Sequence, residues 1–250
     1  SVDGTADVID LAFGTDERVQ LIRLPTNQGP SAARNAGFQA SRGEWIGLLD
    51  SDDTWKPNRI KTLLKHQKEA DFIADNLLAY DVKAGVTTGP VYEGLSDKNL
   101  TFMDFILPSS SDRHDFGYLQ PIIRRKFMEE HKIRYREDVR AGEDLLLNLR
   151  TLAAGARALY VNEPLYVYAT PVGAISRSAS PHSRSTADTA PLIRALEELY
   201  CEVGSKLSSS EKKAFDMRLT DLRQQAPIGA FHRAKAKGHY LKMLSLILGE

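Results

Sequence analysis

Three aspartates crowd the stretch "LLDSDDTWKP", which runs from Leu48 to Pro57. Asp50, Asp52 and Asp53 follow an apolar run directly, so we expect them at the carboxyl end of a strand. In open parallel sheets, ligands bind beyond that end of the strands. Neighbouring carboxylates are unfavourable unless a cation neutralises them, and Mg²⁺ or Mn²⁺ prefers hard oxygen ligands together with phosphate groups. The cluster therefore predicts a divalent metal site.

Other interpretations of this cluster can be compared with the sequence. The simplest is a solvated loop with an aspartate capping the helix that Pro57 opens. A calcium loop of the EF-hand type starting at Asp50 is excluded, because it requires Gly and Glu where the chain has Trp55 and Lys61. An aspartyl-phosphate phosphatase would use Asp50 as nucleophile and Asp52 as acid and base. That pattern usually lies on a first strand and continues Asp-Gly-Thr, and it is kept as an alternative.

A second acidic pair, Glu143 and Asp144, stands in "RAGEDLLLNLR" at the start of a predicted helix over 143–154. The simple interpretation is that acidic residues in a first turn complement the helix dipole. The functional interpretation is that one of the two carboxylates accepts a proton from a hydroxyl group. The spacing of the pair alone does not choose between these.

Composition limits the classes of function. The chain has 250 residues, with 33 basic and 33 acidic side chains, and this balance argues against electrostatic capture of nucleic acid. A single cysteine, Cys201, excludes an internal disulfide framework and a cysteine-rich zinc site. No apolar run reaches the length of about 18 residues that spans a bilayer. We therefore predict a cytoplasmic protein.

Strand-like and helix-like segments alternate in the first third of the chain. We predict strands at 19–24, 45–49 and 72–80 and helices at 6–13, 30–40 and 57–69. This rhythm predicts a mainly parallel sheet with helices on both faces. Further on we predict helices at 101–106, 121–131 and 143–154 and strands at 158–161 and 165–168. Helices at 187–206, 210–225 and 229–248 follow, so we divide the chain into an α/β domain over 1–180 and a helical appendage over 181–250.

The string "RLPTNQGPSAARNAGFQASRGEWIGLLDSDDTWKPNRI" resembles the nucleotide-sugar half of bacterial family 2 glycosyltransferases. The matching positions are Asn27, Gly29, Ala33, Arg34, Asn35, Ala40, Gly43, Glu44, the run from Asp50 to Asp53, Trp55 and Pro57. The resemblance implies a GT-A fold, with a mixed, mainly parallel sheet flanked by helices. It also implies metal-dependent, inverting transfer of a sugar from a UDP-hexose to a surface or exported polysaccharide on a lipid carrier. A binding module without catalysis is the third hypothesis.

Roles for the first cluster come from this resemblance. Asp52 would be the main ligand of Mg²⁺ or Mn²⁺, Asp50 would contact the donor ribose or the metal, and Asp53 would assist or cap the helix. Arg34 would lie near the nucleobase or phosphates, and Asn27 belongs to the same donor-binding set. An exposed surface arginine is the alternative for Arg34.

The Glu143–Asp144 pair resembles the family's Glu-Asp element, which supplies the catalytic base. We assign the base to Asp144 and regard Glu143 as its neighbour. An acceptor hydroxyl must lose its proton as it attacks the anomeric carbon, and the leaving diphosphate needs a cation to balance its charge. The proposal therefore requires that the two acidic clusters face one cavity.

Two segments depart from the family's pattern. "SVDGTADVID" resembles the end of the family's first turn, so we expect an upstream segment of about forty residues that completes the base pocket. In "EPLYVYATPVGAIS" the family's Tyr-Arg is Tyr168-Ala169, and Ser176 and Arg177 are candidates to replace the missing cation as donor-binding residues. A flexible Ser-rich loop is the simpler interpretation of that segment.

The last predicted helix, "GAFHRAKAKGHYLKMLSLILGE", places four cations before an apolar end. Such a helix can lie on anionic lipid at the inner face of a membrane, near a lipid-linked acceptor. More often its apolar face packs on the domain or on a second subunit. Both placements are open at the level of the sequence.

Overall fold

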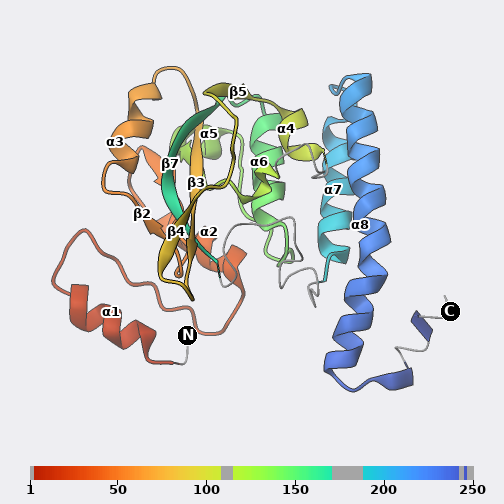
Figure 1. Cartoon of the computed structure of the whole chain (residues 1–250), viewed down its shortest axis with the longest axis horizontal. Coiled ribbons are helices and arrows are strands. Elements are labelled where there is room, and N and C mark those ends of the chain that lie inside the picture. The colour runs from red at the N-terminus through yellow and green to blue at the C-terminus, as the bar shows by residue number, and fades with distance from the viewer. Residues whose placement is uncertain (1–2, 108–114, 171–187, 242–244, 247–250) are drawn as a thin grey trace.

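The computed structural model describes residues 3–107, 115–170, 188–241 and 245–246, and a single mixed sheet forms its centre (Figure 1). Among these residues the sheet has seven strands in the order β1-β6-β3-β7-β2, with β4 beside β3 and β5 beside β7. The strands are β1 (Trp45–Gly47), β2 (Thr54–Trp55), β3 (Phe72–Asp81), β4 (Val86–Pro90), β5 (Lys98–Leu100), β6 (Ile122–Arg124) and β7 (Ala158–Thr170). The predicted strands 158–161 and 165–168 are thus two parts of β7.

The sheet is mixed, as predicted, but it is not mainly parallel. Within the described residues only β3 and β7 pair in parallel, and the other ladders are antiparallel. The prediction failed because β6 inserts between β1 and β3 and runs antiparallel to both, and because β2, β4 and β5 also join by antiparallel ladders. The connection from β1 to β3 therefore keeps the predicted direction, although the two strands are not neighbours.

Two strand predictions and one helix prediction are corrected. Segment 121–131, predicted as a helix, forms β6 and then a short helix, because Ile122 and Ile123 are buried between β1 and β3. Segment 19–24 joins no ladder in the described part of the chain, so its backbone lacks the pairing that a strand needs. The expected buried strand at 45–49 ends at Gly47, since β1 is at an edge of the sheet and Leu49 is 50% exposed.

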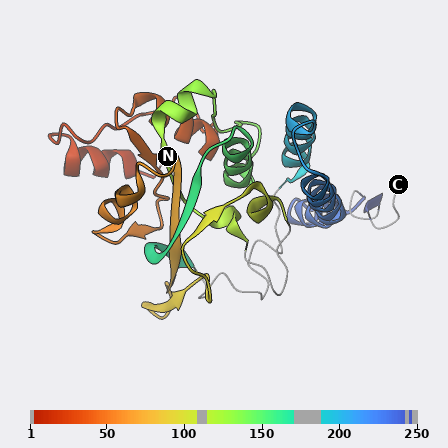
Figure 2. The same ribbon diagram turned by 90° about the horizontal axis from the view of Figure 1, so that it is seen from above.

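Helices cover both faces of the sheet (Figures 1 and 2). The helices are α1 (Thr5–Phe13), α2 (Pro30–Ala40), α3 (Arg59–Leu63), α4 (Phe102–Ile106), α5 (Arg125–Glu130), α6 (Glu143–Ala153), α7 (Ala190–Val203) and α8 (Ser209–Ala236), with 3₁₀ turns at η1 (Leu64–His66) and η2 (Phe116–Tyr118). Alternating residues of β3 serve the two faces, as the period of a strand requires. Phe72 and Ala74 join the large core with α4 and α6, whereas Ile73 packs with Leu63 beside α3.

The predicted C-terminal helices are present and pack on the sheet domain. α7 lies against α6, and α8 lies against both α4 and α7. Leu196 of α7 and Phe215 of α8 are fully buried members of the large core. We predicted separate helices at 210–225 and 229–248. In the structure α8 runs through Pro227 without a break and joins the first of them to the start of the second. The domain boundary at 180 falls among residues outside those described and stays a proposal.

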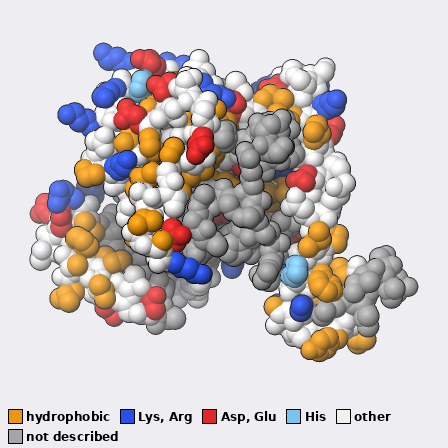
Figure 3. Space-filling model, viewed as in Figure 1, with side chains coloured by type: hydrophobic (Ala, Val, Ile, Leu, Met, Phe, Trp, Pro, Cys, Tyr) orange, Lys and Arg blue, Asp and Glu red, His pale blue; other side chains and the backbone are white. Residues whose placement is uncertain are grey.

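The described surface carries no large region of one charge on the face shown in Figure 3, where acidic and basic side chains are interspersed. Among the helices that the structure describes, none is both long and apolar enough for a membrane span. The N-terminal helix α1 has no buried residue, and Leu11 on it is 91% exposed.

Candidate active site

The aspartate turn after β1 is fastened to β7. The Asp53 backbone N–H donates to the Asp50 carbonyl over 3.1 Å, which closes the turn. Buried Asp53 accepts hydrogen bonds from the Tyr166 hydroxyl at 2.7 Å and from the Ala169 N–H at 2.8 Å. The same hydroxyl accepts from the Asp50 N–H at 3.3 Å. Asp53 therefore anchors the turn, and it does not cap α3, whose N-cap is Asn58.

The second acidic pair occupies the first turn of α6. Gly142 precedes this turn with φ of 78°, a left-handed conformation that favours glycine. A Cβ atom at Gly142 would lie 2.6 Å from Cδ2 of Leu192 on α7. The packing of α7 against this glycine therefore fixes where α6 begins and where Glu143 and Asp144 project.

Arg34 of α2 joins the two acidic clusters. Its Nη2 donates to Asp50 Oδ1 at 2.7 Å, and its Nη1 donates to Glu143 Oε1 at 2.9 Å and to Asp144 Oδ1 at 3.2 Å. The arginine side chain is only 15% exposed, so these contacts are shielded from water. The predicted convergence of the two clusters is thus confirmed, whereas a contact of Arg34 with nucleobase or phosphate stays a prediction.

One face of α2 locks this arginine in place. Ser31 and Asn35 lie three residues before and one residue after Arg34, which puts all three on one helical face. The Ser31 hydroxyl donates to the Val139 carbonyl at 3.0 Å. The Asn35 side chain both donates to the Tyr135 carbonyl, at 2.9 Å, and accepts from the Tyr135 N–H, at 3.0 Å. The segment before α6 is therefore held against α2.

Tyr135 connects that segment to the acidic pair. Its hydroxyl donates to Asp144 Oδ1 at 2.9 Å, and the Arg34 guanidinium lies 5.3 Å from its ring centre. Burial raises the pKa of Asp144 to about 6, against the lowering effects of Arg34 and of the Tyr135 hydrogen bond, while Glu143 raises it further. A carboxylate with this pKa is mostly ionised at neutral pH and is a stronger base than an exposed aspartate.

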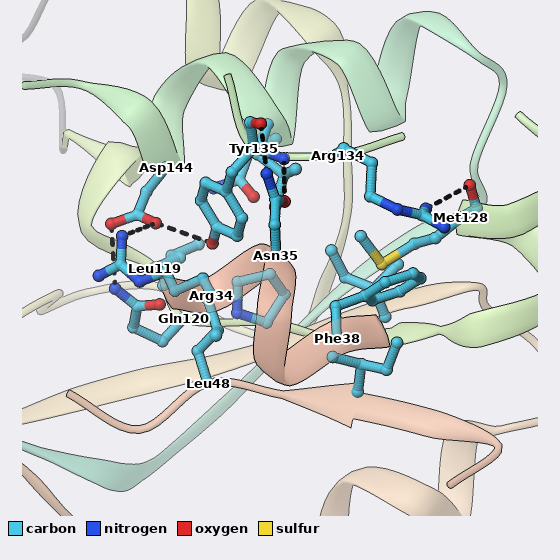
Figure 4. Close-up of a pocket in the computed structure, with 15 residues that line it drawn as sticks. Arg34, Asn35, Phe38, Leu48, Leu119, Gln120, Met128, Arg134, Tyr135 and Asp144 are labelled. Carbon is cyan, nitrogen blue, oxygen red and sulfur yellow. Dashed lines mark hydrogen bonds and ion pairs between the residues drawn. The ribbon is translucent and has the colours of Figure 1, made fainter. Parts of the chain in front are cut away.

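A small cavity lies beside these residues (Figure 4). Its volume is about 30 Å³. Arg34, Gln120, Tyr135 and Asp144 line its polar side. The apolar lining includes Phe38, Leu48, Leu119, Met128 and Leu147. Asp144 is the acidic residue that lines this cavity, and Asp50 is connected to it through Arg34.

Three residues in and beneath the site were not predicted from the sequence. Gln120 and Tyr135 contact Asp144, and Arg59 forms a buried ion pair with Asp75 at 2.7 Å. Arg59 lies at 0% exposure beneath the aspartate turn, although the start of an amphipathic helix favours an exposed arginine. These are single polar residues without a local pattern, so the sequence offered no signal for them.

The aspartate cluster fits one mode of metal binding better than another. The described residues contain no group of three His, Cys, Asp or Glu side chains that could cage an ion. Asp50 is paired with Arg34, and both oxygens of Asp53 accept hydrogen bonds. Asp52 is exposed and has no hydrogen bond or ion pair among the described residues. Mg²⁺ is often held by one or two carboxylates plus substrate phosphates, and Asp52 suits that mode.

The remaining predicted donor-binding residues lie apart from this network. Asn27 is exposed, and its side-chain oxygen accepts a hydrogen bond from the Gly29 N–H at 3.0 Å, so it shapes the turn before α2. Arg177 and Ser176 lie outside the described residues. Trp55, one of the positions that match the family, has its ring centre 4.5 Å from the Arg59 guanidinium.

Comparison with known proteins places this geometry in a family context. Residues 1–132 match the model of the family described as Glycosyl transferase family 2. Succinoglycan biosynthesis protein ExoO of Rhizobium meliloti (strain 1021) is 34% identical over 98% of this chain and 73% of that protein. Succinoglycan biosynthesis protein ExoU of the same organism is also 34% identical, over 86% of this chain and 62% of that protein.

Solved structures share the fold. S. aureus TarS 1-349 in complex with UDP-GlcNAc aligns with a TM-score of 0.61 over 98% of this chain and 78% of that chain. The sequence identity is 14%, so this likeness supports the fold alone. The same protein in complex with UDP aligns with a TM-score of 0.55 at 18% identity.

Proposed function

The chain belongs to glycosyl transferase family 2 and has a GT-A fold, and from this premise we propose that it transfers a hexose from a UDP-sugar to a saccharide acceptor with inversion. The observation that carries the proposal is the bridge that Arg34 makes between Asp50 and the Glu143–Asp144 pair. The same arginine contacts Asp50, which we assign to donor binding, and Asp144, which we assign to proton removal. The names of the two relatives support a polysaccharide as acceptor, and we extend this to a lipid-linked one.

In the proposed reaction, the Asp144 carboxylate accepts the proton of an acceptor hydroxyl as its oxygen attacks the anomeric carbon. The bond from that carbon to the diphosphate breaks on the opposite face, which inverts the configuration and releases the nucleoside diphosphate. Arg34 and Tyr135 orient the base through their hydrogen bonds to Asp144 Oδ1.

Asp52 would hold the Mg²⁺ or Mn²⁺ ion, and Asp50 would contact the donor. When bound, the ion supplies positive charge that balances the leaving diphosphate. Arg34 forms an ion pair with Asp50, so it belongs to the donor side of the site. Its positive charge partly offsets the negative charge of Asp50. The phosphatase alternative is set aside because family membership assigns glycosyl transfer to this fold.

We further propose that the protein works in the cytoplasm and reaches a lipid-linked acceptor from the membrane surface. The support is that the last turn of α8 is basic, with Lys235 beside an Arg233 that pairs with Asp188, and that Ile228 two turns earlier is exposed. A helix with cations and exposed apolar side chains can rest on anionic lipid.

The function is tested by measuring nucleoside diphosphate release from a panel of nucleotide-sugars with Mn²⁺, Mg²⁺ or a chelator. We expect metal-dependent release by the wild-type protein. Asp144→Asn removes the base and should lower turnover by about 10²–10⁴-fold. Asp52→Ala should lower it comparably through loss of the metal. Asp216→Asn, at an exposed position on α8, is the matched control and should retain full activity.

Circular dichroism and thermal unfolding establish that each variant is folded. Full activity of folded Asp144→Asn would refute the assignment of the base. Release that proceeds equally well with chelator would refute the metal dependence.

A further inference from the structure

Gln120 has the position of a link between the two acidic clusters. Its side chain is nearly enclosed, at 6% exposure for the residue. Its Nε2 lies 3.5 Å from Asp50 Oδ2 and 3.4 Å from Asp144 Oδ2. Both neighbours are carboxylates that only accept hydrogen bonds when ionised, so the amide must turn its nitrogen toward them. The orientation of the amide is therefore set by the two carboxylates.

Gln120 and Arg34 hold opposite oxygens of the same two groups. Arg34 donates to Oδ1 of Asp50 and to Oδ1 of Asp144, whereas Gln120 approaches Oδ2 of each. Figure 4 shows Arg34 and Gln120 beside Asp144. The Tyr135 hydroxyl adds a second contact to Asp144 Oδ1. Oδ2 of Asp144 has the long contact to Gln120 as its hydrogen bond in the described structure. This oxygen therefore keeps a lone pair for an incoming hydroxyl.

The backbone of Gln120 is fixed from below. Its carbonyl accepts a hydrogen bond from Arg59 Nη2, and Arg59 also pairs with Asp75. The Arg59 guanidinium lies 4.5 Å from the centre of the Trp55 ring and 5.1 Å from the centre of the Tyr166 ring. Because Arg59 is fully buried and already neutralised by Asp75, it anchors Gln120 without adding charge to the acidic clusters.

We propose that Gln120 is a positioning residue that holds the carboxylates of Asp50 and Asp144 in register, so that Oδ2 of Asp144 faces the acceptor hydroxyl. This inference rests on the proposed function, because it assigns the base to Asp144. The amide donates to both groups without a charge of its own, so it can steady the base without forming a competing ion pair. Within the described residues the buried Oε1 of Gln120 has no hydrogen-bond partner, so the side chain makes its polar contacts there through its donor end.

A side chain with only a structural role at position 120 would leave the pKa of Asp144 unchanged. A hydrogen bond donated to an ionised carboxylate lowers its pKa, so loss of the amide should raise the pKa of Asp144. The charged or titratable groups facing Asp144 are Arg34 from α2, Tyr135 from the preceding segment, Glu143 from α6 and Asp50 from the turn. None of them is changed by a substitution at Gln120.

The test uses Gln120→Met, which keeps the length of the side chain and removes its donor. We expect kcat to fall about tenfold, with the KM for the donor nearly unchanged, because one hydrogen bond to the base is lost. The acid limb of the pH profile should move upward by about 0.5–1 pH unit. Titration of ¹³C-labelled aspartate by NMR, with the Asp144 signal assigned from Asp144→Asn, should show the same upward movement without any turnover.

Two further variants complete the design. Gln120→Glu keeps the shape of the side chain and replaces the donor with a third carboxylate. It should therefore raise the pKa of Asp144 further than Gln120→Met does. Gln224→Met, at an exposed position of α8, is the matched control and should behave as the wild type.

The outcomes separate this inference from the proposed function. If the wild type transfers sugar but the kcat and the Asp144 titration of folded Gln120→Met are unchanged, the positioning role is overturned and the function stands. If the wild type shows no metal-dependent release, the function is overturned, and the NMR titration alone decides whether Gln120 acts on Asp144. If Gln120→Met does not fold, the titration of Gln120→Glu decides in its place.

Discussion

At the scale of single residues, Asp144 is under opposing influences. Burial favours its protonated form, while Arg34 and Tyr135 favour the carboxylate. The result is a pKa of about 6, above the ordinary value for aspartate. A group that must accept a proton near neutral pH benefits from this value, because it is both ionised and reasonably basic.

The pH dependence of catalysis follows from this value. Below about pH 6 the folded protein binds a proton at Asp144, and the base is lost. We therefore expect kcat/KM to fall tenfold for each pH unit below the midpoint and to be level above it until another group titrates. Initial rates between pH 4.5 and 8.5, with circular dichroism at each pH, check this. A limb centred near the ordinary aspartate pKa would show that Asp144 is not the group that titrates.

The charged residues that stand in contiguous motifs could be predicted from the sequence. The residues that position them through hydrogen bonds and ion pairs could not. Asp50 and Asp144 stand in short acidic runs beside apolar segments, which makes them visible one motif at a time. Gln120, Tyr135 and Arg59 acquire their roles only from partners far away in the chain, and the Arg59 guanidinium meets the carbonyl of a residue 61 positions later. Long-range pairing of this kind leaves no local pattern.

At the scale of elements, the site depends on where α2 and α6 begin and what they face. The helix α6 and the strand β3 were predicted because their apolar residues extend over ten or more positions, and α2 was predicted from the Gly29–Pro30 start and the small residues that follow. The three-residue strand β6 was missed, because its apolar residues continue directly into α5. The same strand adds two antiparallel ladders to the sheet and brings Gln120, two residues before it, to the site.

Gly142, the N-cap of α6, sets where the acidic pair begins. Gly142→Ala would place a non-glycine residue at positive φ and set its Cβ 2.6 Å from Leu192 Cδ2. We expect a loss of about 1–3 kcal/mol in the free energy of unfolding, because the backbone is strained and either the Leu192 side chain or α6 must move. A fall in kcat is expected where α6 moves. Urea unfolding and initial rates measure the two effects.

Gly155, just beyond the other end of α6, is the matched control. It also has positive φ, but a Cβ there meets nothing within 4 Å. Gly155→Ala should therefore show the backbone cost of about 1 kcal/mol and leave kcat unchanged. Equal losses of activity in the two variants would mean that contact with α7 does not position the acidic pair.

At the scale of the whole molecule, the C-terminal helices share the core of the sheet domain. Figure 1 shows α7 and α8 beside α6 and α4, and Figure 2 shows the same neighbours from above. Arg218 of α8 is buried and donates to the carbonyls of Phe105, Ile106 and Leu107 at the end of α4. These carbonyls have no later turn of helix to satisfy them, so a cation from α8 takes that role.

Arg218→Met tests how far the two proposed domains depend on each other. The substitution keeps much of the side-chain volume and leaves buried carbonyls without a donor, so the free energy of unfolding should fall by about 2–3 kcal/mol. Arg223→Met, on the same helix, removes a surface ion pair with Glu197 and should cost less than about 1 kcal/mol. Because the core is continuous, near-UV and far-UV circular dichroism should report a single transition in urea for both variants. Two separate transitions in Arg218→Met would instead mean that 181–250 unfolds on its own and that its contact with α4 contributes little to the sheet domain.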